Sequence, residues 1–215
     1  MKRPAFGVYR LEELDRVPGE FEIIPIRHVL GIRSFGVNAY RSPTAGGRVI
    51  EEHDELGSGA GGHEELYVVV RGRARFSLAG EERDAPAGTV VFVADPAVRR
   101  GAVAEEAGTT VLVVGGVRGA AFEPSPWESW LAAFPHYERG DYAHAVDMML
   151  AALAEHPGNA NVLYNLACME ALTGERDPAL THLAEAVEAD PRMREWAQAD
   201  ADFDSIRDDP RFPAA

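Results

Sequence analysis

The sequence is short of the residues that several common classes of site require. Its one cysteine, Cys168, excludes an intramolecular disulfide framework and a zinc site built from several thiolates. Lysine occurs once, at Lys2. The chain has 21 basic and 35 acidic side chains in total, which gives a formal net charge of −14. Such a surface repels nucleic acid and anionic lipid, and no local basic cluster reverses its field. We therefore expect neither nucleic acid nor membrane as a partner.

Long apolar runs are also missing. No stretch approaches the ~20 apolar residues of a membrane-spanning helix, and the first residues, MKRPAFGVYRLEELDR, lack the apolar segment of a secretory signal. We therefore expect a soluble, cytoplasmic protein. With 215 residues, 46% of them hydrophobic, the chain is long enough for one or two domains with ordinary cores.

Charge and composition both change near the middle of the chain. Residues 1–120 carry 15 basic and 17 acidic side chains, a net charge of −2, whereas residues 121–215 carry 6 and 18, a net charge of −12. The first part has short β-rich runs separated by Gly and Pro, and the second is rich in Ala and Leu with helical spacing. We predict one domain over 1–117, a linker over 118–125 and a second domain over 126–215.

The first domain is predicted to be all-β, a barrel or a double sheet, because several short strands alternate with turn residues. The segments ELYVVV and ARFSL, joined by RGR, are predicted to form a hairpin. The expected strands are Phe21–Ile26, His28–Phe35, Arg48–Asp54, Glu65–Val70, Ala74–Leu78, Val90–Val93, Ala102–Ala104 and Thr109–Val114.

Two segments of this domain carry spaced residues that resemble a known family. Glu65 is followed after six residues by Gly72, and Gly80 is followed after five residues by Pro86-Ala-Gly88. These segments resemble the two conserved blocks of the cupin superfamily, in the expected order, over residues 20 to 117. The resemblance implies a small β-barrel of the jelly-roll kind.

The resemblance also implies a metal site, which this sequence alters. Metal-binding cupins carry His-x-His shortly before the Glu of the first block, whereas in this chain only His53 lies upstream of Glu65. They also carry a His in the second block, at the position that Val91 occupies in this chain. His63 lies two residues before Glu65, so alternation puts both on one strand face together with Tyr67. If that face is the interior, as the resemblance implies for Glu65, then His53, His63 and Glu65 converge. Two imidazoles and a carboxylate suit one divalent transition metal: zinc, iron, nickel or manganese.

Two interpretations of these residues stay open. In the first the His and Glu side chains only bond one another or face water, and the interior is filled by apolar side chains such as Val69, Val91 and Val93. In the second the protein is a metal-dependent cupin enzyme, an oxygenase or isomerase, with Glu51 or Tyr67 beside the substrate. A pocket lined by Glu51, Tyr67 and Val91 is expected in the barrel.

The second domain repeats itself at a fixed interval. Four pairs of small or helix-ending residues are each separated by 34 residues, the period of the tetratricopeptide repeat, which this part of the chain resembles. We predict repeats over 126–159 and 160–193 and a capping helix, MREWAQADADF, after them. Ser125 is expected to cap the first helix in a box with Glu128, and Pro135 to interrupt it. The pairs are Gly140 with Gly174, Ala145 with Ala179, Ala152 with Ala186, and Pro157 with Pro191.

Trp127, Trp130 and Phe134 make the first of these helices unusually aromatic. Two repeats and a cap are below the number that is usually stable alone. These rings are therefore expected to be buried against the barrel or the next repeat, or alternatively against a partner protein.

The resemblance to tetratricopeptide arrays implies a protein-binding face, which would include Tyr164, Asn165 and Cys168. Its negative charge favours an Arg- or Lys-rich peptide or a second copy of the chain. In the alternative the acidic residues form only a solvated surface. Cys168 is expected to be a buried structural thiol, since no cation adjoins it in sequence. The remaining histidines, His136, His144, His156 and His182, are expected at the surface of the helices.

The sequence thus predicts a multidomain β + α protein: a cupin-like jelly roll followed by an α-helical tetratricopeptide unit. The barrel is expected to be non-catalytic or ligand-sensing, to be a homodimer as cupins commonly are, and to be coupled to a protein-interaction module. The alternative is the metal-dependent enzyme with a nonstandard His/His/Glu site.

Overall fold

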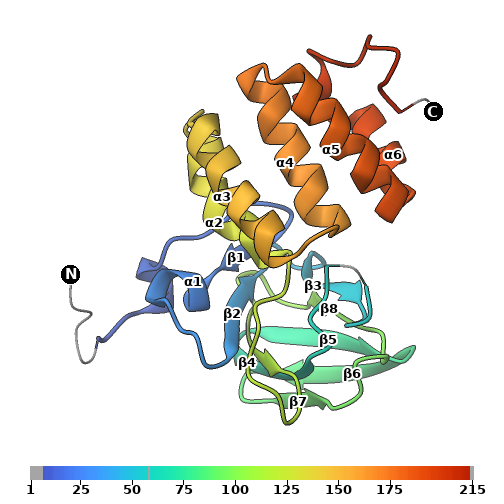
Figure 1. Ribbon diagram of the computed structural model, residues 1–215. Helices are drawn as coiled ribbons and strands as arrows, with labels where there is room; N and C mark the ends of the chain where they lie inside the picture. Colours follow the sequence, from blue (N-terminus) through green and yellow to red (C-terminus); the bar gives the residue numbers. More distant parts are fainter. Residues whose placement is uncertain (1–6, 58, 214–215) are drawn as a thin grey trace. The chain divides into compact units, whose positions relative to one another are not determined.

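The computed structural model describes residues 7–57 and 59–213 (Figure 1). The chain forms two compact units, one of Met1–Leu56 and Gly62–Glu123, and the other of Gly57–Gly61 and Pro124–Ala215. Within the described ranges, none of the helices combines the length and the apolarity that a membrane crossing demands.

The first unit consists of two antiparallel sheets, with strand orders β1-β2-β9-β4-β7 and β3-β8-β5-β6. From β2 onward most connections pass from one sheet to the other, so strands that follow one another in sequence are rarely hydrogen-bonded. Pairing among the described residues does not close the two sheets into one continuous barrel. The elements are η1 (Leu11–Glu13), β1 (Glu22–Ile24), α1 (Ile26–Leu30), β2 (Gly36–Arg41), β3 (Arg48–His53), β4 (Glu64–Arg71), β5 (Arg73–Leu78), β6 (Glu81–Pro86), β7 (Val90–Val93), β8 (Arg100–Ala104) and β9 (Thr110–Gly116).

Alternating side chains of β4 build the core of this unit. Tyr67 and Val69 are buried there, and Tyr67 lies opposite Val91 of β7 in the register of the two strands. The Tyr67 ring meets Phe76 of β5 edge to face, with centroids 5.6 Å apart. The predicted alternation along this strand is confirmed, and it turns Glu65 toward the same buried side.

One predicted strand and one predicted hairpin are wrong. The segment His28–Phe35, expected as a strand, instead contributes to helix α1, which follows Pro25 and ends at Gly31 in the left-handed conformation, with φ 58°. The strand forms only afterwards, as β2. Short apolar runs are ambiguous between the two states, and here the Pro and Gly that bound the helix decide.

The hairpin expected between ELYVVV and ARFSL does not form, because β4 and β5 belong to different sheets. Gly72 between them has φ 74°, and a Cβ there would lie 2.5 Å from Oγ1 of Thr109. The chain therefore changes sheets at a residue that only glycine suits. The hairpin of this region joins β5 to β6, through Ala79 and Gly80, both with positive φ.

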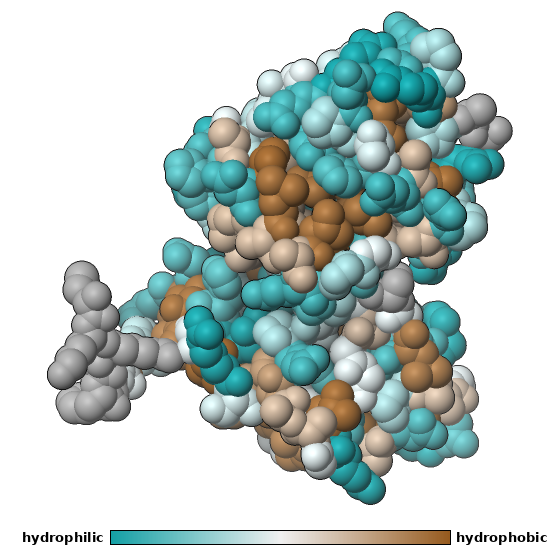
Figure 2. All heavy atoms as spheres, in the orientation of Figure 1, coloured by the Kyte–Doolittle hydropathy of each residue, from teal (hydrophilic) through white to brown (hydrophobic). Residues whose placement is uncertain are grey.

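The second unit contains two antiparallel helix pairs and a shorter helix: α2 (Glu128–Glu138) with α3 (Tyr142–Glu155), α4 (Ala160–Thr173) with α5 (Arg176–Ala189), then α6 (Arg192–Ala199) and η2 (Ala201–Phe203). Gly140 and Gly174 lie in the turns of the two pairs, with φ 71° and 84°. In the view of Figure 2, apolar side chains lie among hydrophilic ones over α3 and α4.

The first helix of this unit differs from the prediction at its start and at Pro135. It begins at Glu128, after a turn in which the Ser125 carbonyl accepts the Glu128 amide at 3.0 Å, and Trp127 occupies the N-cap position. Pro135 lies inside the helix and does not end it. The Trp130 ring packs on Phe134 and Tyr137 of the same helix, with centroids 5.5 and 5.3 Å away.

Candidate functional site

A cluster of ionisable side chains lies at one end of the sheets of the first unit. His53 is the last residue of β3 and is paired with Arg100, the first residue of β8. Glu65 lies at the start of β4. These three residues, with Glu55 and His63 from the segment between β3 and β4, are called the interior cluster below.

Arg100 and Glu65 form the centre of the interior cluster. The Arg100 side chain is fully buried, and its Nη2 and Nε donate to Oε2 of Glu65 at 2.6 and 3.0 Å. The Tyr67 hydroxyl donates to the same oxygen at 2.5 Å. The carbonyls of Pro96 and Val98 accept from Nη1 of Arg100. The guanidinium is therefore neutralised and hydrogen-bonded within the protein, as a buried charge requires.

The electrostatics of the cluster follow from these contacts. Burial alone would raise the pKa of Glu65, but hydrogen bonds from His53, Tyr67 and Arg100 hold it at about 2. Burial and the neighbouring Glu65 carboxylate raise the pKa of Tyr67 far above its ordinary value. Glu65 is consequently an anion, and Tyr67 a neutral hydrogen-bond donor, throughout the neutral range.

His53 lies between two carboxylates. Its Nε2 is 3.6 Å from Oε2 of Glu65 and 3.8 Å from Oε1 of Glu55, and its Nδ1 is 2.7 Å from the Glu51 carbonyl oxygen. Partial burial lowers the pKa of His53, but Glu65 and the Glu51 carbonyl outweigh it and raise the pKa overall. About a third of the side chain, 34%, is exposed, so His53 connects the cluster to solvent.

His63, the second histidine of the interior cluster, is buried. Its Nδ1 lies 3.8 Å from Oε2 of Glu55, and its ring lies 5.5 Å from the Phe122 ring. No group in the described part of the chain pairs with its buried Nε2. A buried unpaired nitrogen costs about 1–3 kcal/mol, so Nε2 of His63 is the unsatisfied polar atom among the described residues of this cluster.

The predicted metal ligands are only partly brought together. Among the described residues of this unit, one ligand atom each of His53, Glu55 and Glu65 lies within 4.8 Å of the others, and His63 does not belong to this group. Glu51 of the expected pocket is exposed and pairs with Arg48 at 3.8 Å. Val91 and Tyr67 do face one another on the buried side of β7 and β4.

The residues present fit a metal ion poorly. The Glu65 oxygen that would bind the ion already accepts from a fully buried guanidinium, and two cations beside one carboxylate repel one another. The second-block ligand position is the apolar Val91. One imidazole and the Glu55 carboxylate remain, which is fewer than the three protein ligands of ordinary catalytic sites.

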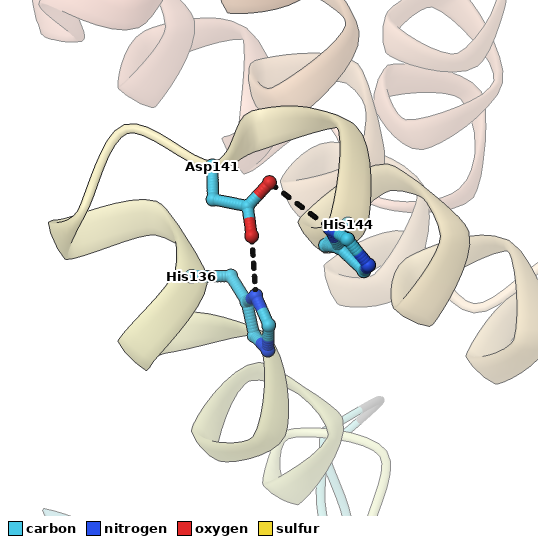
Figure 3. Close-up of side chains that lie close together, drawn as sticks. All are labelled: His136, Asp141 and His144. Atoms are coloured by element: carbon cyan, nitrogen blue, oxygen red, sulfur yellow. Dashed lines mark hydrogen bonds and ion pairs between the residues drawn. The ribbon is translucent and has the colours of Figure 1, made fainter.

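Two histidines of the second unit, which the sequence predicted only to lie at the surface, share one carboxylate. His136 and His144 both bond the carboxylate of Asp141, and their rings are stacked with centroids 5.3 Å apart (Figure 3). His182 is also engaged, with its Nδ1 2.7 Å from the buried Glu170 carboxylate.

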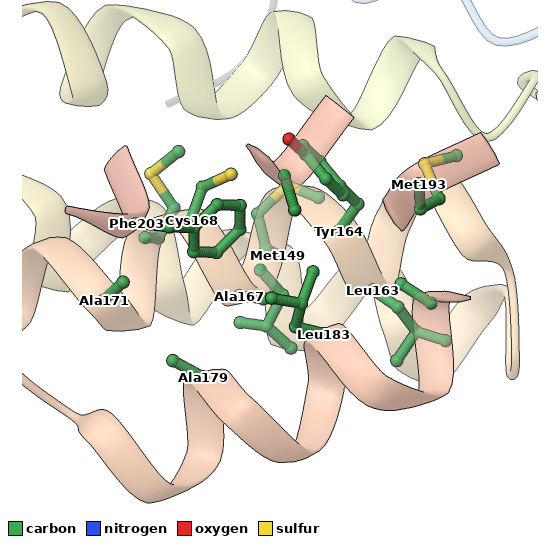
Figure 4. Packing of buried hydrophobic residues seen from close by; sticks show 14 of the residues in the cluster. Met149, Leu163, Tyr164, Ala167, Cys168, Ala171, Ala179, Leu183, Met193 and Phe203 are labelled. Atoms are coloured by element: carbon green, nitrogen blue, oxygen red, sulfur yellow. The ribbon is translucent and has the colours of Figure 1, made fainter. Parts of the chain in front are cut away.

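The expected peptide-binding residues lie on α4. Tyr164 and Cys168 are buried (Figure 4), and the Tyr164 hydroxyl donates to Oδ2 of Asp200 at 2.9 Å. Burial raises the pKa of the Cys168 thiol well above its ordinary value. Asn165 is partly exposed and donates to the Asn161 carbonyl. A peptide on this face would have to displace the contact with Asp200.

Sequence reasoning missed Arg100 and Glu55. Arg100 meets Glu65 only through the pairing of β3 with β8, which no local pattern reveals. Glu55 had a local signal, since it lies two residues after His53, on the same face of an extended chain.

Comparisons with family models and with curated proteins give no match to this sequence. Cupin proteins of low identity to this chain are among the solved structures that match it. KdgF from a Halomonas species is 20% identical, with 51% of this chain and 93% of that chain covered and a TM-score of 0.41. An RmlC-like cupin from Shewanella frigidimarina is 16% identical, with 55% and 97% covered and a TM-score of 0.39.

A candidate sugar phosphate isomerase from Acidithiobacillus ferrooxidans is 19% identical, with 46% of this chain covered and a TM-score of 0.37, and the match spans only 58% of that protein's length. At these identities and TM-scores, no function passes from these proteins to this chain.

Proposed function

We propose that the first unit is a cupin-type jelly roll that senses a small polar ligand without a catalytic metal, and that it is coupled to a protein-interaction unit of tetratricopeptide repeats. The observation that carries this proposal is the buried Arg100–Glu65 ion pair. The Arg100 guanidinium is a permanent cation beside Glu65, and Glu65 is the residue that the cupin resemblance makes a metal ligand.

The strand order supports the jelly roll. Strands β2 to β9 divide into the orders β2-β9-β4-β7 and β3-β8-β5-β6, with β1 added at one edge. Two four-stranded sheets whose connections pass from one to the other are the arrangement of an eight-stranded jelly roll built from two Greek keys.

The ligand is proposed to bind at His53 and His63. His53 is the partly exposed member of the interior cluster, and Nε2 of His63 is its buried unpaired nitrogen. The cluster holds a cation and two carboxylates: Arg100 pairs with Glu65, and Glu55 lies near His53 and His63. A small polar molecule with both donors and acceptors suits such a surrounding.

The segment between these histidines supports coupling to the second unit. The chain leaves the first unit after Leu56 and returns at Gly62, and the residues between them group with the helices. Glu55 and His63 therefore adjoin a segment that belongs to the second unit.

Metal analysis and ligand screening of the untagged protein test this function. We expect protein purified without chelator to hold no stoichiometric zinc, iron, nickel or manganese in the interior cluster, and small polar compounds to raise its melting temperature in a way that His63→Phe abolishes. Stoichiometric metal that is lost in both His53→Ala and Glu65→Gln would instead establish the metal-dependent enzyme and overturn the proposal.

The helix pairs support the repeat assignment. Gly140 and Gly174 occupy equivalent left-handed turn positions 34 residues apart. Ala145 and Ala179 are both fully buried, as small residues at the close crossing of two helices must be. The proposed partner is a basic segment, because this half of the chain carries a net charge of −12.

A pull-down from cells that express the full chain tests the partner, and we expect the captured segments to be basic and released by salt. A set of mostly acidic partners would contradict it. The proposal includes a cytoplasmic location, which fractionation of the same cells checks.

A further inference from the structure

The turn between α2 and α3 brings together three side chains that the proposed function does not use. His136 lies in the last turn of α2, Asp141 is the N-cap of α3, and His144 lies in the first turn of α3 (Figure 3). One atom from each, a ring nitrogen or a carboxylate oxygen, lies within 4.8 Å of the others. This set is called the turn cluster.

The carboxylate of the turn cluster is committed to the two imidazoles. Its Oδ2 is 3.0 Å from Nδ1 of His136 and its Oδ1 is 3.0 Å from Nδ1 of His144. An aspartate at an N-cap ordinarily accepts from the first backbone amides of the helix, but Asp141 makes no such bond. Its side chain holds the two rings instead.

The backbone fixes this arrangement. The Asp141 amide donates to the His136 carbonyl at 2.9 Å, and the Gly140 amide donates to the Tyr137 carbonyl at 2.9 Å. Gly140 has φ 71°, which allows the tight turn. The three ligating residues are thus held on two helix ends and one closed turn, and little chain entropy remains to be lost when a ligand binds.

We propose that the turn cluster binds one divalent transition-metal ion of the zinc class through Nδ1 of His136, Nδ1 of His144 and the Asp141 carboxylate. Two imidazoles and a carboxylate are a usual donor set for Zn²⁺. At bonds of about 2.0–2.2 Å, ligand atoms around one ion lie about 3.0–3.5 Å apart. Each Nδ1 lies 3.0 Å from its own carboxylate oxygen, and the three ligand atoms, which lie within 4.8 Å of one another, have to draw together around the ion.

The protons balance without a further reactant. Because an ionised carboxylate can only accept, each ring that hydrogen-bonds to Asp141 carries a proton on Nδ1. When the ion binds, each ring carries its proton on Nε2, which lies on the side of the ring away from Asp141 in Figure 3. The net charge of −12 over residues 121–215 favours a cation at this place, and the side-chain exposure of 41% for Asp141 and 69% for His144 leaves the ion open to water ligands.

Calorimetric titration of the full-length, untagged protein with Zn²⁺ tests the site. We expect one Zn²⁺ bound by the wild type, and an affinity lowered by about tenfold or more in His144→Gln and in Asp141→Asn, since even loss of an orienting carboxylate costs about 10–100-fold. His156→Gln, a partly exposed histidine of the same unit outside the cluster, is the matched control and should bind like the wild type.

His53→Gln separates this site from the interior cluster and should also leave the turn-cluster affinity unchanged. Circular dichroism checks that each variant is folded. The proposal is overturned if the wild type takes up no Zn²⁺ at millimolar concentration, or if His144→Gln and Asp141→Asn bind Zn²⁺ as His156→Gln does.

Discussion

Arg100 is the residue on which the interior of the first unit depends most. It is fully buried and shares one oxygen of Glu65 with the Tyr67 hydroxyl. Removing one member of a buried ion pair leaves the other charge without compensation in a medium that solvates it poorly. The consequences of replacing Arg100 therefore exceed those of losing a surface ion pair.

Arg100→Met is expected to lower the free energy of unfolding by roughly 3–5 kcal/mol, the range for a broken buried pair. The pKa of Glu65 should rise at the same time, because a cation that holds it down is gone. Denaturant unfolding of the full chain measures the first effect.

The double variant Arg100→Met with Glu65→Gln is the control for this prediction. It removes both charges, so it should be more stable than Arg100→Met alone. Equal stability of the single and double variants would contradict the role assigned to the ion pair.

His53 gives the first unit a dependence on pH. Its pKa is raised in the folded protein, mainly because Glu65 outweighs the effect of burial. A raised folded pKa means stability that is fully present below the ordinary histidine value and is lost as pH rises through the folded value. The difference in unfolding free energy between wild type and His53→Gln should therefore shrink from pH 5.5 to pH 8, and a constant difference would exclude the Glu65 contact as its cause.

At the residue scale the sequence predicted what lies along one strand but not what lies across strands. Glu65 and Tyr67 share the buried face of β4, as alternation requires. Arg100, which decides the chemistry of that face, is 35 residues away in sequence. Its neighbours Val98 and Arg99 gave no reason to place its charge inside.

Among the elements, the helices α3, α4 and α5 follow their sequence signals closely. Asn159 caps α4, and its side-chain oxygen accepts from the amides of Asn161 and Val162. Gly174 ends the helix in the left-handed conformation, with φ 84°. Both are ordinary helix boundary signals, which act locally and can be read from sequence.

Asn159→Ala is expected to lower the free energy of unfolding by about 1 kcal/mol, the usual cost of losing an N-cap side chain. Asn159→Asp retains an acceptor and should keep most of that stability. Thermal unfolding followed at the helical circular dichroism band measures both, and an alanine variant as stable as the aspartate variant would contradict the capping role.

The strands were harder to predict than the helices for a physical reason. Val90–Val93 was predicted with its exact limits, because it is a short β-branched run between turns. β6 was missed because four of its six residues are charged. A strand at the edge of a sheet tolerates such residues, and no periodic apolar signal then remains.

At the scale of the whole molecule, the edge strands β6 and β7 differ in how strongly their side chains discourage pairing with another chain. β6 ends one sheet with Glu81, Glu82, Arg83, Asp84 and Pro86, which discourage pairing with another chain. β7 ends the other sheet with four apolar residues, of which Val90 and Phe92 are 57% and 56% exposed. We propose that the expected homodimer forms by contact between the β7 edges of two copies.

Phe92→Lys is expected to convert a dimer into a monomer, because it places like charges opposite each other across a two-fold contact. Light scattering over a range of concentrations measures the mass. Val8→Lys, at an exposed apolar residue outside the sheets, is the control and should remain dimeric. A monomeric wild type at every concentration, or a dimeric Phe92→Lys, would refute the β7 contact.

The five residues Gly57–Gly61 group with the helices although they lie between two strands of the first unit. The border between the two units is therefore crossed three times by the chain and corresponds to no single position in the gene. A fragment that starts at residue 124 would lack part of its own unit, and a fragment that ends there would carry a piece of the other. Any attempt to express the two halves separately therefore has to decide on which side these glycine-rich residues belong.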